Sequence, residues 1–269
     1  MNDEMRSPDA PRRFYDYPLY YEVAFAGGTA LECERVLTLL ARHGLAEPGD
    51  VLEAACGGGR FLLALAEHGW RASGYDAHPA MVAFAAGRAF ASPSGDSVAV
   101  WRADMRAPLA GGGFDAALCL NNSLGYLHGD DELSAHLRAT AGCLKPGGLY
   151  VIQLGCAWDK LDPEDEARWQ ARWGRVETDV SWRVVREDHA AKRSHEQCRV
   201  RVRDGARELV IDEPHCLRLW FDADLRALAA TAGFVVEAVY SADLAQLAPA
   251  TRLSGELGNL YFVLRAGAR

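Results

Sequence analysis

The 269-residue sequence predicts an α/β fold: a doubly wound, mostly parallel sheet of seven strands, with an antiparallel β cap inserted after the fifth strand. Two observations lead to this prediction. From about residue 50 to 155, short apolar runs alternate with helical stretches, which is typical of parallel strands joined by crossover helices. Within residues 156–220 apolar residues instead recur at every second position, which indicates half-exposed antiparallel strands.

The elements can be placed one by one along the chain. Val51–Ala55 is short, apolar and flanked by turn formers, so it is predicted to be a buried strand, and Phe61–His68 continues as a helix. Asp204-Gly205 predicts a hairpin turn within the cap. The other predicted strands are 71–75, 97–102, 114–120, 148–154, 234–240 and 258–264, and the other predicted helices are 30–43, 79–90, 132–143 and 222–232.

The turn after the first strand is the most informative segment. Gly57, Gly58 and Gly59 allow the backbone to turn sharply and to approach a ligand without a Cβ atom in the way. Asp76 stands at the end of the next strand, where an acidic side chain can hold the two hydroxyls of a ribose, although aspartate is also a common helix N-cap. Together they predict a nucleoside-containing cofactor over the carboxyl ends of parallel strands.

The spacing of the glycines helps to decide which cofactor this is. A dinucleotide-binding loop needs a third glycine three residues after the second, and here Leu62 occupies that position. The phosphate-binding pattern GxxxxGK[ST] is absent. An NAD- or nucleotide-sugar-dependent enzyme and a non-catalytic cofactor-binding module remain as alternatives.

Five motifs in order carry a family resemblance. Glu53-x-Ala55-x-Gly57-x-Gly59 resembles motif I of the class I S-adenosylmethionine-dependent methyltransferases, with Ala55 where that family has its first glycine. The other four resemble later motifs of the family and extend the match over about residues 45–155: Gly74-Tyr75-Asp76, Ala103-Asp104-Met105, Phe114–Leu120 and Leu144–Gly148. The chain is identified as a member of this family, similar to its small-molecule glycine and aminosugar N-methyltransferase groups.

The resemblance implies a Rossmann-like fold, a cofactor and an activity. The expected enzyme transfers a methyl group from S-adenosylmethionine, by direct in-line displacement, to an N or O atom of a small-molecule acceptor and releases S-adenosylhomocysteine. The glycines would pass under the amino-acid end, Asp76 would take the ribose, and Asp104 with Met105 would flank the adenine. The full expected cofactor set is Tyr21, Glu53, Ala55, Cys56, Gly57, Gly59, Asp76, Ala77, Asp104, Met105 and Leu120.

The acceptor side is expected from the segments outside the core. We divide the chain into a tail and aromatic lid (1–45), a methyltransferase core (46–155 and 221–269) and a substrate cap (156–220), and we expect Tyr15–Tyr21 to fold over the cofactor. The predicted substrate-binding residues are Tyr15, Asn122, Tyr126 and Arg218. His128 and His215 are the candidate general bases, although a loop histidine is more often a solvated turn residue and tyrosine clusters are more often packing.

Composition disfavours several other classes. A net charge of −8 argues against a nucleic-acid partner, and Asn121-Asn122-Ser123-Leu124 departs from the Asp/Asn-Pro-Pro-aromatic segment of DNA amino-methyltransferases. No apolar run has the length of a membrane span, so no membrane partner is expected. The seven cysteines lack paired spacing, which fits a reduced, cytoplasmic protein. No metal-ligand spacing is present, so no metal is expected, and homo-oligomerisation is left open.

Overall fold

The computed structural model describes residues 13–107, 111–162 and 166–267, so most of the predicted polar tail (1–13) lies outside the described residues. Its centre is a seven-stranded sheet, the large sheet, with the order β10-β11-β5-β4-β1-β2-β3. The strands from β5 to β3 in this order run parallel, and β11 pairs antiparallel with both β5 and β10. The strands are β1 (Asp50–Ala54), β2 (Arg71–Asp76), β3 (Val98–Arg102), β4 (Phe114–Cys119), β5 (Leu144–Gly155), β10 (Phe234–Tyr240) and β11 (Asn259–Ala266).

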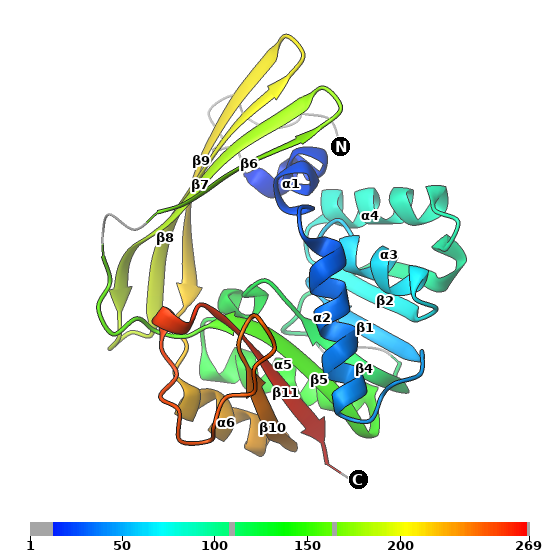
Figure 1. Ribbon diagram of the computed structural model, residues 1–269, viewed down its shortest axis with the longest axis vertical. Helices are drawn as coiled ribbons and strands as arrows, with labels where there is room; N and C mark the ends of the chain where they lie inside the picture. Colours follow the sequence, from blue (N-terminus) through cyan, green and yellow to red (C-terminus); the bar gives the residue numbers. More distant parts are fainter. Residues whose placement is uncertain (1–12, 108–110, 163–165, 268–269) are drawn as a thin grey trace.

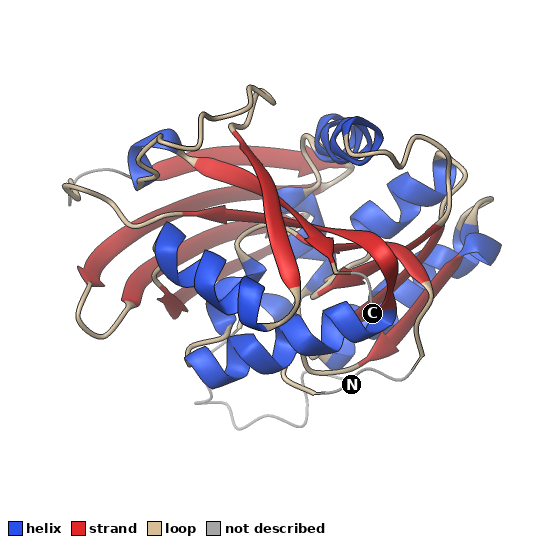
Figure 2. Ribbon diagram, turned by 90° about the horizontal axis from the view of Figure 1, so that it is seen from below, coloured by secondary structure: helices blue, strands red, loops and turns tan. Residues whose placement is uncertain are grey.

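Helices cover both faces of the large sheet (Figure 2). Apolar side chains of α2 (Thr29–Arg42) and α3 (Arg60–Glu67) pack on one face, and those of α5 (Asp130–Cys143) and α6 (Asp222–Thr231) pack on the other. The remaining long helix, α4 (Pro79–Ala91), contacts β2 and β3. Because the central strands β4 and β5 are covered on both faces, their buried residues form nearly continuous runs, whereas the edge strand β3 has no fully buried residue.

The predicted fold class is confirmed, and all seven predicted strands of the large sheet are present. One difference concerns Leu144–Gly148, the motif that leads into the predicted strand 148–154 and resembles the turn before the fifth strand of the family. In the structure β5 already begins at Leu144, which pairs with Phe114, and pairing resumes between Ala116 and Leu149. The intervening residues bulge out of the ladder, where Gly147 adopts a φ of +77°. The turn chemistry of Pro146 and Gly147 therefore produces a bulge within a strand rather than a loop before it.

A second sheet of four antiparallel strands, the small sheet, follows β5. It consists of β6 (Ala167–Trp173), β7 (Val176–Asp188), β8 (Arg193–Asp204) and β9 (Arg207–Arg218), and the hairpin between β8 and β9 turns at Gly205 as predicted. The alternation found in the sequence places Val180, Val200 and Ile211 on its buried face. The strand β6 was not predicted, although Ala167–Trp173 alternates between apolar and polar residues along its whole length.

The residues 14–25, which we call the aromatic segment, cover that buried face. They form a short 3₁₀ turn, η2 (Phe14–Asp16), and the helix α1 (Pro18–Phe25). Phe14, Tyr20 and Val23 share one apolar cluster with the small sheet. Figure 1 shows α1 between the small sheet and the end of the molecule that carries α4, and α1 contacts both. No helix among the described residues has the length and apolarity needed to cross a bilayer.

Candidate cofactor and acceptor site

The glycine loop, residues 55–59, joins β1 to α3 at the carboxyl edge of the large sheet. Ala55, Gly57 and Gly59 have φ values of +52°, +53° and +73°, a region that L side chains with a Cβ atom adopt at a cost of about 1–2 kcal/mol. Ala55 therefore stands where the backbone conformation favours glycine. A Cβ atom added to Gly57 would meet no protein atom within 4 Å, so the loop leaves open space at that point.

Asp76 lies beside this loop at the end of β2. One of its carboxylate oxygens accepts a hydrogen bond from the N–H of Gly57 (2.9 Å), and the other accepts one from the N–H of His78 (2.8 Å). Burial raises the pKa of Asp76, and the two N–H donors act against that rise. Each oxygen keeps a further lone pair, so the carboxylate can still accept hydrogen bonds from a pair of hydroxyls. The N-cap of α4 is His78, and Asp76 accepts the N–H of that residue rather than capping the helix itself. The role of Asp76 at the ribose stays a prediction.

Glu53 lies under the glycine loop with only 3% of its surface exposed. Its Oε2 atom is buried and has no hydrogen-bond partner among the described residues. Burial raises the pKa of this carboxyl to about 8, while Arg60 acts to lower it. A buried carboxyl without a partner is costly unless a cation or donor reaches it, and it therefore fits the ammonium group of an amino-acid moiety held by the loop.

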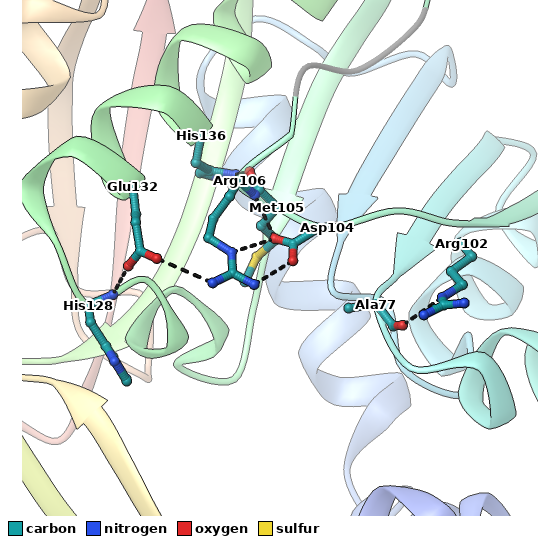
Figure 3. A network of polar contacts seen from close by, with 8 residues as sticks. All are labelled: Ala77, Arg102, Asp104, Met105, Arg106, His128, Glu132 and His136. Atoms are coloured by element: carbon teal, nitrogen blue, oxygen red, sulfur yellow. Dashed lines mark hydrogen bonds and ion pairs between the residues drawn. The ribbon is translucent and has the colours of Figure 1, made fainter.

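Asp104 is engaged by a neighbouring arginine (Figure 3). Arg106 donates from Nε to Oδ1 (2.9 Å) and from Nη2 to Oδ2 (2.6 Å) of Asp104, and from Nη1 to Oε1 of Glu132 (3.3 Å). These bonds lower the pKa of Asp104. Asp104 thus remains ionised at the edge of the large sheet, and an adenine amine that reached it would share the carboxylate with Arg106.

The remaining expected cofactor residues are close to the same edge. Cys56 and Leu120 are buried. The carbonyl of Ala77 accepts a hydrogen bond from Nε of Arg102 (3.1 Å), and that of Met105 accepts one from Nδ1 of His136 (3.2 Å) (Figure 3). Tyr21 comes from the opposite side, on α1, and lines the cavity described next.

A cavity of about 350 Å³ lies where the aromatic segment, the residues after β4 and the small sheet meet. Phenylalanine, tyrosine and tryptophan supply nine of its 26 lining residues, and polar groups come from the small sheet and from the residues after β4. Its lining includes Phe14, Tyr15, Tyr21, Phe25, Asn121, Asn122, Tyr126, Trp158, Trp169, Trp182, Glu187, Glu196, His215, Arg218 and Trp220. Tyr21 of the predicted cofactor residues lines this cavity, whereas Gly57, Asp76 and Asp104 do not.

A chain of hydrogen bonds crosses the cavity wall. The hydroxyls of Tyr15 and Tyr126 are 2.8 Å apart, and the Tyr126 hydroxyl is 3.0 Å from Nδ1 of His215. Since Tyr15 lies in η2, Tyr126 in η4 (Ser123–Tyr126) and His215 in β9, the chain joins three separate segments. The other ring nitrogen of His215, Nε2, is buried and has no hydrogen-bond partner among the described residues. Burial lowers the pKa of His215, so its ring is neutral at pH 7.

The other predicted acceptor-side residues differ in their surroundings. His128 does not line the cavity, and its Nε2 donates to the carbonyl of Cys216 (2.7 Å), a contact that ties the segment after β4 to β9. Arg218 lines the cavity, is 2% exposed and pairs with Asp130. Asn122 adopts a φ of +57°, and its backbone N–H donates to the carbonyl of Gln153 (3.0 Å). No three His, Cys, Asp or Glu side chains converge as metal ligands would in the part of the chain that is described.

Some residues of the cavity were missed by sequence reasoning. Trp182 stacks on His215 with ring centroids 4.8 Å apart, and its Nε1 donates to Glu196 (2.6 Å). Gln153 is buried and does not line the cavity, but it supports the lining residue Asn121: it donates to Tyr261 (3.0 Å) and accepts from the N–H of Asn121 (2.9 Å). The signal for Trp182 was present, because tryptophan on the apolar side of an alternating strand is large enough to fill a cleft, but its partners are remote in the sequence.

Comparison with known proteins agrees with this geometry. A family model described as a methyltransferase domain matches residues 51–148. Mouse glycine N-methyltransferase (Mus musculus) is 32% identical over 142 residues, which are 45% of this chain and 47% of that enzyme. A dTDP-3-amino-3,6-dideoxy-alpha-D-glucopyranose N,N-dimethyltransferase of Streptomyces fradiae is 32% identical over 117 residues, 44% of each protein. The chain thus spans about half the length of the curated relatives that it matches.

Solved structures match over nearly the whole chain. The sugar N-methyltransferase KedS8 from Streptoalloteichus sp. has a TM-score of 0.74 and 25% identity, and the match covers 99% of this chain and 98% of that one. DesVI of Streptomyces venezuelae also has a TM-score of 0.74, at 21% identity and with 96% and 100% covered, and at this identity it supports the fold alone.

The fold, the five motifs and the matched domain agree with one another. The strand order of the large sheet, the glycine loop with its open space, and the acidic residues Glu53 and Asp76 beside it fit S-adenosylmethionine as the cofactor. The matching domain model, the relatives in sequence and the similar solved structures named above are all methyltransferases. Residues 51–148 thus form a methyltransferase domain, and the chain has the fold of the class I S-adenosylmethionine-dependent methyltransferases.

Proposed function

We propose that this protein methylates an amine nitrogen of a small molecule bound in the cavity between the aromatic segment and the small sheet. The observation that carries the proposal is the cavity itself. Its volume of about 350 Å³ falls within the roughly 300–1000 Å³ range of small-molecule sites. Phe25 in its wall accepts a hydrogen bond from Arg60, the residue after the glycine loop, and a buried histidine whose Nε2 has no hydrogen-bond partner among the described residues also forms part of the wall.

The residues of the glycine loop are proposed to hold the cofactor. Asp76 would accept hydrogen bonds from the ribose hydroxyls, Glu53 would lie nearest the amino-acid ammonium, and Asp104 would accept from the adenine amine. The cofactor, when bound, supplies a methyl group that its positive sulfonium already activates. The chain therefore needs no covalent nucleophile of its own and acts by placing the acceptor in line and by excluding water.

The cavity walls are proposed to bind and orient the acceptor. Trp158, Trp169, Trp182 and Trp220 offer flat apolar faces, against which the C–H faces of a sugar ring can pack. Glu187 and Glu196 add negative charge, which favours a cationic amine in the bound state. Two relatives are named for glycine and for an amino sugar, and the many aromatic walls fit the larger of these acceptors better.

His215 is proposed to take the proton that the amine loses. Its Nε2 is buried, has no hydrogen-bond partner among the described residues and lies 4.0 Å from Oε2 of Glu213. In the tautomer in which Nδ1–H donates to the Tyr126 hydroxyl oxygen, Nε2 is the basic nitrogen, and the ring is oriented before the acceptor arrives. A neutral imidazole is the form that can accept a proton, and burial favours that form. The contact of His128 with a backbone carbonyl gives it a structural role instead, as a link between the segment after β4 and the small sheet.

The domain division proposed from the sequence gains one refinement. The predicted lid and cap are proposed to act as a single unit on the acceptor, because the aromatic segment packs on the small sheet and both line the cavity. The core, in this proposal, holds the cofactor.

The test combines binding with an acceptor screen. Calorimetry with S-adenosylmethionine, S-adenosylhomocysteine and NAD separates a methyltransferase from a dinucleotide-dependent enzyme. Transfer of radiolabel from methyl-labelled S-adenosylmethionine is then measured with glycine, with dTDP-linked amino sugars and with analogues carrying a hydroxyl in place of the amine. We expect transfer to an amino sugar and none to its hydroxyl analogue. Transfer only to hydroxyl analogues would refute the choice of nitrogen.

A further inference from the structure

Glu22 is a buried acidic residue that none of the cofactor or acceptor assignments above uses. It lies in α1, has 3% of its surface exposed, and forms an ion pair with Nη1 of Arg88 on α4 (2.6 Å). Burial raises the pKa of Glu22, whereas Arg88 and Arg60 act to lower it. A buried ion pair often adds little net stability, whereas removal of one partner leaves the other charge buried without compensation. The Glu22–Arg88 pair is therefore better explained by what it positions than by the stability that it adds.

The ion pair reaches the glycine loop. The same Nη1 of Arg88 donates to the carbonyl of Gly58 (3.0 Å). A Cβ atom placed on Gly58 would come within 3.0 Å of Oε2 of Glu22 and within 3.3 Å of the ring of Phe84, so α1 and α4 enclose the loop at that residue. Gly57, the loop residue before Gly58, donates its N–H to the carboxylate of Asp76.

A second arginine ties the end of α1 to the start of α3. Arg60, which follows the loop directly, donates from Nη1 to the carbonyl of Phe25 and to Oγ1 of Thr29 (3.1 Å). The loop and the aromatic segment are thus joined at two points, Arg88–Glu22 and Arg60–Phe25. A shift of α1 therefore moves groups that contact the loop.

The same helix also builds the acceptor cavity. Tyr21, the neighbour of Glu22, lines the cavity, and Tyr15 in the adjoining η2 turn bonds to Tyr126. One short segment therefore contacts both the loop proposed to hold the cofactor and the wall proposed to hold the acceptor.

We propose that Glu22 is a positioning residue, which acts through Arg88 on the carbonyl of Gly58 and so couples the placement of the aromatic segment to cofactor binding by the glycine loop. This proposal rests on the proposed function. It predicts that the cofactor binds weakly when the pair is broken, and that bound cofactor stabilises the aromatic segment, and with it the acceptor cavity. The acceptor would then follow the cofactor into the site.

The test needs no acceptor, because S-adenosylhomocysteine serves as the probe. Calorimetry gives its Kd for wild type, Glu22→Gln, Arg88→Gln and the double variant. We expect each single variant to raise Kd about tenfold, within the usual range of coupling between sites, and the double variant to match the singles rather than their product. Tyr20→Phe is the matched control, since it removes a hydrogen bond from the same helix to Asp204 (3.1 Å) in the small sheet, away from the loop.

Limited proteolysis with chymotrypsin supplies a second measurement. S-adenosylhomocysteine should slow cleavage within residues 14–25 in wild type and in Tyr20→Phe, and should not do so in Glu22→Gln. If Glu22→Gln does not fold, Arg88→Gln decides the question, because its side chain is 28% exposed and its loss is tolerated more easily. Kd values within twofold of wild type in folded variants would overturn the coupling. Failure of wild type itself to bind the probe would instead overturn the proposed function.

Discussion

Replacing Glu53 by Gln should stabilise the ligand-free protein, and the gain should grow with pH. The folded protein raises the pKa of Glu53 from 4.5 to about 8 because the carboxyl is buried. The native state then binds more protons than the unfolded state between these two pH values, so wild-type stability falls as the pH rises through that window. Gln resembles the protonated carboxyl and does not titrate.

The magnitude follows from the two pKa values. Ionisation of Glu53 costs the fold almost nothing at pH 4, about 3 kcal/mol at pH 7 and about 5 kcal/mol at pH 9. The Glu53→Gln variant should therefore match wild type at pH 4 and exceed it by about these amounts at the higher pH values. Urea unfolding followed by circular dichroism between pH 4 and 9 measures the difference. Glu47→Gln, at an exposed position, is the matched control and should change stability by less than about 0.5 kcal/mol at every pH.

Cofactor binding should reverse the preference of the folded protein for the protonated form of Glu53. If the amino-acid ammonium lies next to Glu53, the bound complex favours the carboxylate, so S-adenosylhomocysteine binding near pH 7 should release a proton. Calorimetry in two buffers of different ionisation enthalpy detects that release, and Glu53→Gln should abolish it. A stability difference that does not vary with pH, or a variant less stable than wild type at pH 9, would refute the reasoning from burial.

Three further predictions concern single residues. Asp76→Ala should weaken S-adenosylhomocysteine binding by about 1.5–3 kcal/mol, the loss of hydrogen bonds to a charged acceptor, and unchanged affinity in calorimetry would contradict its assignment to the ribose. His215→Gln should lower kcat about 100-fold or more and remove the acidic limb of the pH profile, whose midpoint should lie below the usual histidine pKa. His128→Gln should retain kcat and lose stability. If His128→Gln lost kcat and His215→Gln retained it, the two roles would be exchanged. Gly74→Ala should lower the free energy of unfolding by about 1–3 kcal/mol, because the added Cβ atom would lie 2.6 Å from a methyl carbon of Leu62. Gly87→Ala on α4 is the control, since its Cβ atom would meet no atom within 4 Å, and it should not lower the melting temperature.

Some features of this protein could be predicted because they depend on residues close together in the chain. The strand Val51–Ala54, the glycine turn and the acid at Asp76 lie within one β-loop-α-β unit, where backbone conformation and register follow from local sequence. The positive φ of Gly57 and the hydrogen bond from its N–H to Asp76 are the physical form of that motif. The alternation in Val176–Val184 likewise predicted a sheet with one buried face.

What covers that face was not predictable from the pattern. The alternation requires a partner but does not say which, and the structure assigns it to Phe14, Tyr20 and Val23 of the aromatic segment. The same limit applies to the two histidines. In the sequence they were equal candidates for the base, and only the tertiary contacts distinguish them, because His128 meets a backbone carbonyl while His215 meets Tyr126 and keeps one nitrogen free.

The sequence by itself determined the class of the fold and the glycine loop and indicated the methyltransferase family, because each of these depends on short-range patterns of glycine, acid and apolar residues. The tertiary structure alone decided how the acceptor cavity is built and which residue reaches the glycine loop from outside. Tyr15, Tyr126 and His215 are about 90 to 200 positions apart along the chain and still share one hydrogen-bonded chain. Glu22 and Arg88 likewise come from different helices. Contacts at such separations result from packing the two sheets and their helices together, and no local pattern encodes them.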